Sequence, residues 1–269
     1  MKRTRDRPIV FLGGGRITSA LIAGLRLAGY KYRIVVHDRH IPKLAQLKRK
    51  YKVEVETDLR RAVDAAYLLI VAVRPDGIRD LFKTIGVIQR PITAVSVAAG
   101  VPLTKLRACL GPLVRWARAM PSPVCRSGRG LTALIFEPAL PVDARREVTQ
   151  LFETVGQVIE IPENHFDAFT VTYSASHGYH ALGALAQSAE KVGLDRKTAI
   201  IAAAHALADG INAWREGKLS LDDLLREAAT PGGTAATVIK AMTTAGYDRA
   251  VERGIRAGIA RTKKNARLI

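Results

Sequence analysis

The first part of the chain joins a short apolar run to a segment with helical spacing. The run Ile9-Val10-Phe11-Leu12 consists of β-forming residues and ends in Gly13-Gly14-Gly15. From Ile17 to Ala28 the apolar residues recur at intervals of three and four, which is typical of one apolar face of a helix, and Gly29 closes it. The pattern therefore predicts a strand, a glycine turn and a helix in immediate succession.

Later apolar runs predict the other strands of a sheet, and the continuous run at 66–73 is typical of a central parallel strand. We expect strands at 32–38, 53–56, 66–73, 92–97, 113–120, 131–136 and 157–161. Helices are expected at 43–51 and 59–63, from the Arg74-Pro75-Asp76 segment onward, and at 143–155 with Asp143 as N-cap and Gly156 as C-cap. The alternation implies an α/β fold with a doubly wound sheet.

The last third of the chain is different, because no convincing strand follows His165. Alanine-rich helical segments run to the end, and Gly193, Gly217 and Gly246 bound several of them. The domain boundary is expected near Pro162, which gives a nucleotide-binding domain at 1–162 and a helical domain at 163–269. Such a helical half readily packs against a copy of itself.

The glycine turn predicts a phosphate-binding site. The dinucleotide fingerprint G-x-G-x-x-G/A is met at Gly13 and Gly15, but Thr18 stands where its third small residue belongs. Asp38 ends the next expected strand, 20 residues after Thr18, where an acidic side chain meets the adenosine ribose. Small residues at Ala98-Ala99-Gly100 follow another strand and are placed to line a flat cofactor ring.

A second anion site is expected at Thr230-Pro231-Gly232-Gly233-Thr234. Thr230 suits a helix N-cap, and Pro231 suits the first helical position. Gly232 and Gly233 would then present bare N–H groups to a carboxylate. The alternative is an ordinary capped helix, although two glycines in a first turn cost about 1 kcal/mol each relative to alanine.

Composition narrows the classes of protein. The chain has 269 residues, 48% of them apolar, and a formal net charge of +18. No apolar run approaches the ~20 residues that span a bilayer. Cys109 and Cys125 form no metal-binding or disulfide pattern, so we expect no metal and a cytoplasmic location. The charge could favour nucleic acid, but the basic clusters lack interleaved aromatic residues, so a nucleic-acid partner is not expected.

Several blocks in the same order resemble the pyrroline-5-carboxylate reductase family over nearly the whole chain, of which this sequence is identified as a divergent member. They are Leu12-Gly13-Gly14-Gly15, Ala72-Val73-Arg74-Pro75, Ser96-Val97-Ala98-Ala99-Gly100, Arg118-Ala119-Met120-Pro121, Gly130-Leu131-Thr132-Ala133-Leu134, Asp167-Ala168-Phe169-Thr170 and Thr230-Pro231-Gly232-Gly233-Thr234. The resemblance implies a Rossmann-like N-terminal domain followed by an all-α dimerisation domain. It also implies hydride transfer from NADPH or NADH to a cyclic imine, such as pyrroline-5-carboxylate in proline biosynthesis, in a homodimer or larger homo-oligomer.

The resemblance extends the cofactor site. The expected cofactor-binding residues are Gly13, Gly14, Gly15, Arg16, Ile17, Asp38, Arg39, Ala72, Val73, Arg74, Pro75, Ala98, Ala99 and Gly100. Asp38 favours NADH, because a carboxylate repels a 2′-phosphate, whereas Arg39, His40 and Lys43 could bind that phosphate. The resemblance favours NADPH, and NADH stays open.

The expected substrate site departs from the family pattern. The resemblance implies that Thr230, Gly232, Gly233 and Thr234 hold the carboxylate of the imine. The family's second threonine, whose hydroxyl lies nearest the imine nitrogen, is replaced by Ala235, and the stretch 173–179 is altered. Thr234, Thr230, Ser176 and His177 are therefore the expected catalytic residues. Pyrroline-5-carboxylate itself is left open as the substrate.

Three alternatives follow. A β-hydroxyacid dehydrogenase shares the architecture but uses a lysine early in the helical domain, and no lysine lies between Pro121 and Glu190. A reductase of another imine or keto substrate would keep the cofactor half. A non-catalytic NAD(P)-binding regulatory homologue would bind the cofactor and reduce no cyclic imine.

Overall fold

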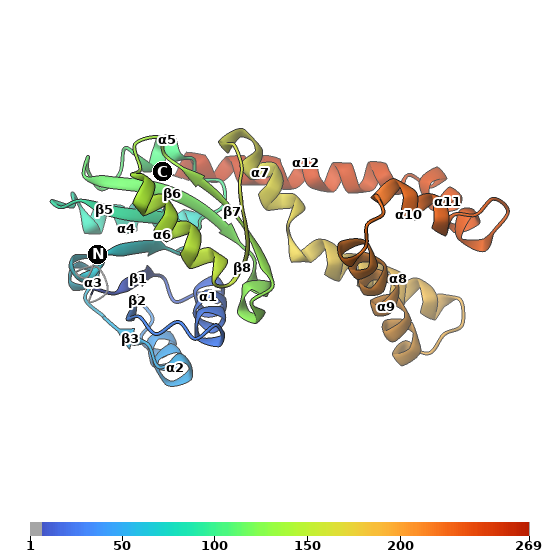
Figure 1. Cartoon of the computed structure of the whole chain (residues 1–269), viewed down its shortest axis with the longest axis horizontal. Helices are drawn as coiled ribbons and strands as arrows, with labels where there is room; N and C mark the ends of the chain where they lie inside the picture. The colour runs from blue at the N-terminus through green and yellow to red at the C-terminus, as the bar shows by residue number, and fades with distance from the viewer. Residues whose placement is uncertain (1–6, 269) are drawn as a thin grey trace. The chain divides into compact units, whose positions relative to one another are not determined.

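The computed structural model describes residues 7–268 and divides by its contacts into two compact units. One unit extends to Val171 and resumes at Gly258, and the other is Thr172–Ala257 (Figure 1). These units are defined by contacts alone, so the expected functional division after residue 162 stays a prediction.

The first unit contains the sheet, which has eight strands within residues 7–268 in the order β3-β2-β1-β4-β5-β6-β7-β8. The strands are β1 (Ile9–Leu12), β2 (Ile34–His37), β3 (Glu54–Val55), β4 (Leu68–Val71), β5 (Ile92–Ser96), β6 (Val114–Pro121), β7 (Gly130–Phe136) and β8 (Gly156–Glu160). Strands β1 to β6 are parallel, β7 is antiparallel to β6, and β8 is parallel to β7. The expected doubly wound α/β fold is confirmed, and the strand order reverses between β1 and β4.

Helices cover both faces of this sheet, because the parallel strands β1, β2, β4, β5 and β6 contribute apolar side chains to both sides. One face packs against α1 (Arg16–Leu27), α2 (Ile41–Tyr51) and α6 (Val142–Glu153). The other packs against α3 (Leu59–Ala65), α4 (Pro75–Ile85), α5 (Leu103–Leu106) and α7 (Glu163–Thr172). The 3-10 helix η1 (Pro123–Ser127) lies so close to α1 that a Cβ on Gly24 would come within 2.2 Å of the Cys125 carbonyl oxygen.

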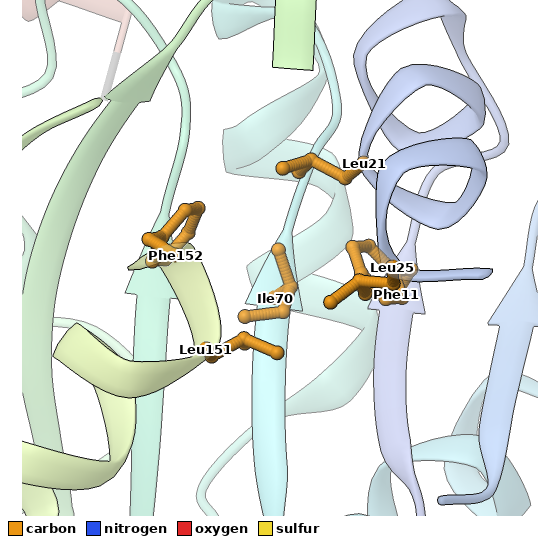
Figure 2. A pocket seen from close by; sticks show the side chains of 6 residues that line it. All are labelled: Phe11, Leu21, Leu25, Ile70, Leu151 and Phe152. Atoms are coloured by element: carbon orange, nitrogen blue, oxygen red, sulfur yellow. The ribbon is translucent and has the colours of Figure 1, made fainter. Parts of the chain in front are cut away.

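The core under α1 and α6 is closely packed. Figure 2 shows the six apolar side chains around its internal cavity, which are Phe11, Leu21, Leu25, Ile70, Leu151 and Phe152. The cavity measures about 10 Å³, which is about the space of one water molecule. Its lining has no polar group to hold a water, so the cavity is a packing defect and not a ligand site.

Two expected helix caps are wrong. Helix α6 begins at Val142 with Pro141 as its N-cap, so Asp143 lies in the first turn. Its C-cap is Thr154, and Gly156 instead begins β8. Gly156 has φ +151°, and an added Cβ would lie 2.0 Å from the Gly130 carbonyl oxygen, so this glycine serves the close pairing of β7 and β8. The short helices α5 and η1 were not predicted.

The second unit is helical, and no strand follows residue 165 within the described part of the chain, as expected. It contains α8 (Ala175–Lys191), α9 (Arg196–Glu216), α10 (Leu221–Ala228), α11 (Thr234–Thr244) and the first part of α12 (Tyr247–Asn265). The rest of α12, from Gly258, and the following 3-10 helix η2 (Ala266–Leu268) belong to the first unit. The buried core of the second unit consists of Ala186, Ala199 and Ala203, between α8 and α9. Helices α10 and α11 bury no residue. Among residues 7–268, no helix is long and apolar enough to cross a membrane.

Candidate functional site

The candidate cofactor site lies at the carboxyl ends of β1, β2, β4 and β5. The hydrogen-bond ladder continues past these strand ends, since Gly13 N–H donates to His37 O at 2.7 Å and Ala72 N–H donates to Leu12 O at 2.8 Å. Val97 N–H likewise donates to Val71 O at 3.0 Å. The four following loops are therefore held side by side where the strand order reverses, which is the position of the ligand crevice in open α/β sheets.

Glycine is present at positions 13 and 15 of the turn for two different physical reasons. Gly13 has φ +109°, and an added Cβ would lie 2.7 Å from the Ala72 carbonyl oxygen, so the protein itself requires glycine there. Gly15 has an ordinary φ of −78°, and an added Cβ would meet no protein atom within 4 Å. The bare face of Gly15 thus opens to the space that a ligand would occupy.

Helix α1 begins at this turn without a side-chain cap. Within residues 7–268, four other α-helices have a capping side chain, from Asp58, Ser174, Asp195 and Ser220, and Ser122 caps the 3-10 helix η1. The first-turn N–H groups of α1 have no intrahelical acceptor, and they lie at the positive end of the helix dipole. Exposed Arg16 begins the helix and adds a cation. This geometry fits a pyrophosphate, which would satisfy the N–H groups that the protein leaves open.

Thr18, which departs from the small residue expected at the third position of the fingerprint, contacts the glycine turn through its side chain. Its side chain is fully buried, and its hydroxyl donates to Gly13 O at 2.5 Å. The hydroxyl therefore ties the start of the helix back to the turn. The signal was present in the sequence, because the third position of the fingerprint is where the helix meets the strand.

Asp38 lies at the end of β2 as expected, and it also holds the glycine turn. Its Oδ2 accepts a hydrogen bond from Gly14 N–H at 2.7 Å, and its Oδ1 accepts one from His40 N–H at 2.8 Å. Burial alone would raise the pKa of this carboxyl group, but the bonds from His40 and Gly14, with Lys43 nearby, hold that pKa below its usual value. Each oxygen keeps a second lone pair, so contact with a ribose hydroxyl stays a prediction.

The loop after β5 is held from the C-terminal end of the chain. Asn265 Nδ2 donates to Ala99 O at 3.1 Å, and a Cβ on Gly100 would lie 2.1 Å from the Thr262 carbonyl oxygen. Gly100 also has φ +75°, which favours glycine. Thr262 and Asn265 were not expected at this site, because no local signal in the sequence links residues so far apart.

The expected geometry of the Pro-Gly-Gly segment is wrong. Helix α11 begins at Thr234 with Gly233 as its N-cap, so Thr230 is not the cap and Pro231 is not in the helix. The four residues 230–233 form a turn in which Gly233 N–H donates to Thr230 O at 2.9 Å and Gly232 has φ +78°. Proline followed by glycine with positive φ is typical of a type II turn. The Gly233 N–H is therefore used, and the open donors are the first-turn N–H groups of α11, which has no side-chain cap.

Ser176 and His177 lie in the first turn of α8. Ser174 caps this helix through its hydroxyl, which lies 2.7 Å from the hydroxyl of Ser176, and His177 N–H donates to Ser174 O at 3.0 Å. These residues and the Pro-Gly-Gly turn thus stand at the N-termini of two helices of the second unit, α8 and α11. Their catalytic roles stay predictions. Among residues 7–268, no group of His, Cys, Asp and Glu side chains could hold a metal ion.

The fold and the uncapped glycine turn define the class: a dinucleotide-binding protein with a Rossmann-like domain and a helical domain. Two family models match the chain, described as NADP oxidoreductase coenzyme F420-dependent over residues 8–100 and pyrroline-5-carboxylate reductase dimerisation over residues 163–265. The chain is 28% identical to the pyrroline-5-carboxylate reductase of Synechocystis sp. over 259 residues, which cover 94% of this chain and 96% of that protein. Over nearly its whole length the chain is similar to pyrroline-5-carboxylate reductases, and its helical part matches the dimerisation model of that family.

Solved structures give the same fold. The pyrroline-5-carboxylate reductase of Streptococcus pyogenes superposes with a TM-score of 0.87 at 21% identity, covering 96% of this chain and 98% of that one. The pyrroline carboxylate reductase of Plasmodium falciparum, solved with NADP bound, gives a TM-score of 0.85 at 17% identity, covering 98% of this chain and 99% of that one.

Proposed function

We propose that this protein is an NADPH-dependent imine reductase that converts a cyclic imino acid, pyrroline-5-carboxylate or a close relative, to the corresponding cyclic amino acid. The observation that carries the proposal is the uncapped N-terminus of α1 behind an open Gly15, in a chain similar to this family. When bound, NADPH would supply a hydride to the carbon of the C=N bond; the nitrogen would gain the electron pair of the π bond and a proton, and NADP⁺ would be the second product.

The chain's own residues bind and orient the cofactor. The open N–H groups of α1 and the Arg16 guanidinium would hold the pyrophosphate. Exposed Arg39 and His40 follow Asp38 directly, and Lys43 Nζ lies 4.0 Å from Asp38 Oδ2. The Arg39 and Lys43 cations partly neutralise the Asp38 carboxylate, so a 2′-phosphate can be accommodated beside it. We therefore assign NADPH as the preferred cofactor, with NADH as the weaker substitute.

The substrate carboxylate would lie at the N-terminus of α11. The open N–H groups there and the hydroxyls of Thr230 and Thr234 make a donor set for one carboxylate. With Ala235 lacking a hydroxyl, the hydrogen bond to the imine nitrogen falls to Thr234, Ser176 or His177. An iminium is already electrophilic, so positioning of the hydride donor about 3–3.5 Å from the carbon contributes more than a strong acid or base.

The test of the proposal is NADPH oxidation with pyrroline-5-carboxylate and a panel of other cyclic imines, in wild type and Thr234→Ala. Turnover in wild type, with a loss of roughly 10-fold or more in the variant, would support the substrate site. Lys240→Ala, an exposed substitution further along the same helix, is the matched control and should keep full activity.

Cofactor binding without turnover of any imine would favour the alternative functions, either a keto substrate or a non-catalytic NAD(P)-binding regulator. The cofactor assignment has its own test: KM for NADPH and NADH in wild type and Arg39→Ala. A preference for NADPH that survives the substitution would contradict the role of Arg39.

We also propose that the protein is a homodimer. The second unit exposes large apolar side chains on α9, α10 and α11, and a single copy gives them no cover. They include Ile201, Ile211, Trp214, Leu221, Leu225, Val238 and Ile239. A second copy would bury these faces, as helical domains of this kind do. Light scattering at micromolar concentration should give twice the monomer mass, and a stable monomer would refute the dimer.

The two free cysteines accord with the proposed cytoplasmic location.

A further inference from the structure

The end of α12 lies against the loop that follows β5, and the contact is made by backbone and side chain together. Asn265 Nδ2 donates to Ala99 O at 3.1 Å. The Thr262 carbonyl oxygen occupies the place that a Cβ of Gly100 would take, at 2.1 Å. The loop and the helix end are thus fitted to each other over two consecutive residues of the loop.

The orientation of the Asn265 amide is fixed from its other side. Arg261 Nη1 donates to Asn265 Oδ1 at 2.6 Å, so the amide oxygen has a donor and the amide nitrogen is directed to Ala99. Thr262 is 7% exposed, and its hydroxyl donates to Gly258 O at 2.9 Å within the helix. The hydroxyl is therefore satisfied inside the helix, and the methyl group of Thr262 faces Gly100.

The position of this loop in the sheet decides which half of a dinucleotide it would contact. Asp38 marks the adenosine side of the crevice, at the end of β2, and the strand order reverses between β1 and β4. The other half of a dinucleotide must therefore extend over β4 and β5. Ala98, Ala99 and Gly100 follow β5 directly, so their backbone would lie beside the nicotinamide ring.

We propose that Asn265 is a positioning residue for the nicotinamide half of the cofactor, acting through the Ala99 carbonyl group. The inference rests on the proposed function, because it takes the crevice to be the NADPH site. Gly100 has φ +75°, a conformation that glycine leaves readily, so the loop needs an external anchor to keep one shape. Without that anchor, cofactor binding must itself order the loop, which weakens binding.

The experiment compares wild type, Asn265→Ala, Asn265→Asp and the control Lys264→Ala, all in the full-length protein. Lys264 is an exposed neighbour on the same helix turn. Asn265→Asp has the same shape and can still accept from Arg261, but it has no hydrogen to donate to Ala99 O. The measurements are the Kd for NADPH by fluorescence titration, hydrogen exchange of the peptide 97–102 without cofactor, and the KM for the imine at saturating NADPH.

We expect both Asn265 variants to raise the Kd for NADPH about 2- to 10-fold, which corresponds to the loss of one hydrogen bond. Hydrogen exchange of the 97–102 peptide should become faster in both Asn265 variants. Lys264→Ala should keep the wild-type Kd and exchange rate, and the KM for the imine should stay unchanged in all variants. Wild-type affinity and exchange in Asn265→Asp would overturn the positioning role while leaving the proposed function intact. Failure of wild type to bind NADPH would overturn the proposed function itself, and the positioning role with it.

Discussion

Arg118 Nη1 donates to Glu163 Oε1 at 3.0 Å, although only 2% of Arg118 is exposed. The same carboxylate oxygen accepts a hydrogen bond from Leu103 N–H at 2.7 Å, so it joins β6, α5 and α7. The guanidinium lies 4.3 Å from the centre of the Phe166 ring. Burial lowers the pKa of Arg118, and the hydrogen bond that Arg118 donates to Glu163 opposes that shift. The pair keeps a buried charge within the layer of helices next to the cofactor loops.

Breaking this pair should be costly. In Glu163→Ala the buried guanidinium loses its counter-ion, and we expect the free energy of unfolding to fall by about 3 kcal/mol, at the low end for buried pairs because 34% of the Glu163 side chain is exposed. The matched control is Glu54→Ala, which breaks the exposed pair with Arg33 and should cost less than about 1 kcal/mol. Urea denaturation measures both, and equal losses would contradict the assignment.

Gly13 and Gly15, two of the three glycines of the turn, should respond in opposite ways to alanine. Gly13→Ala forces a Cβ to within 2.7 Å of Ala72 O at a positive φ, so we expect a clear fall in the melting temperature. Gly15→Ala places its Cβ in open space at an ordinary φ, so the melting temperature should hold while the Kd for NADPH rises by about 10-fold or more. A Gly15→Ala protein that binds NADPH normally would show that the pyrophosphate lies elsewhere.

Asp38 should make stability depend on pH. Its pKa is lowered in the folded protein, so its contribution is fully present above the unfolded pKa of about 3.9 and is lost as the pH falls through the folded value. Asp38→Asn keeps one acceptor oxygen for two backbone donors, and we expect it to be about 1–2 kcal/mol less stable at pH 7. Unfolding curves measured between pH 7 and pH 3 should show the difference from wild type narrowing, and a constant gap would argue against the hydrogen bonds.

Cys125 should be inert in the native protein. Its side chain is fully buried beside α1, and burial raises its pKa to about 12. The thiolate is the reactive form, so iodoacetamide at neutral pH should alkylate Cys125 no faster than the protein unfolds. Peptide mass spectrometry over time, with and without urea, measures this. Rapid native alkylation of Cys125 would mean that η1 opens away from α1.

Local patterns in the sequence were sufficient for the sheet and the glycine turn after β1. The run before Gly13 and the spacing after Ile17 predict β1 and α1 because strand and helix periodicity are properties of neighbouring residues. The acid after β2 was placed correctly for the same reason. Helix caps were harder: Asp143 and Thr230 both fit a cap by residue type, yet Pro141 and Gly233 hold those positions. Side-chain preference is a weak guide when a proline or glycine alongside fixes the backbone.

The sequence by itself determined the strands and the longer helices in their order, the glycine turn after β1, and the similarity to pyrroline-5-carboxylate reductases. Only the tertiary structure decided that both oxygens of Asp38 bind the backbone, that Glu163 balances Arg118, and that Asn265 holds Ala99. The physical reason is distance along the chain. A turn or a helix face is set by residues a few positions apart, whereas Ala99 and Asn265, 166 positions apart, meet only when the complete sheet and its helices have packed.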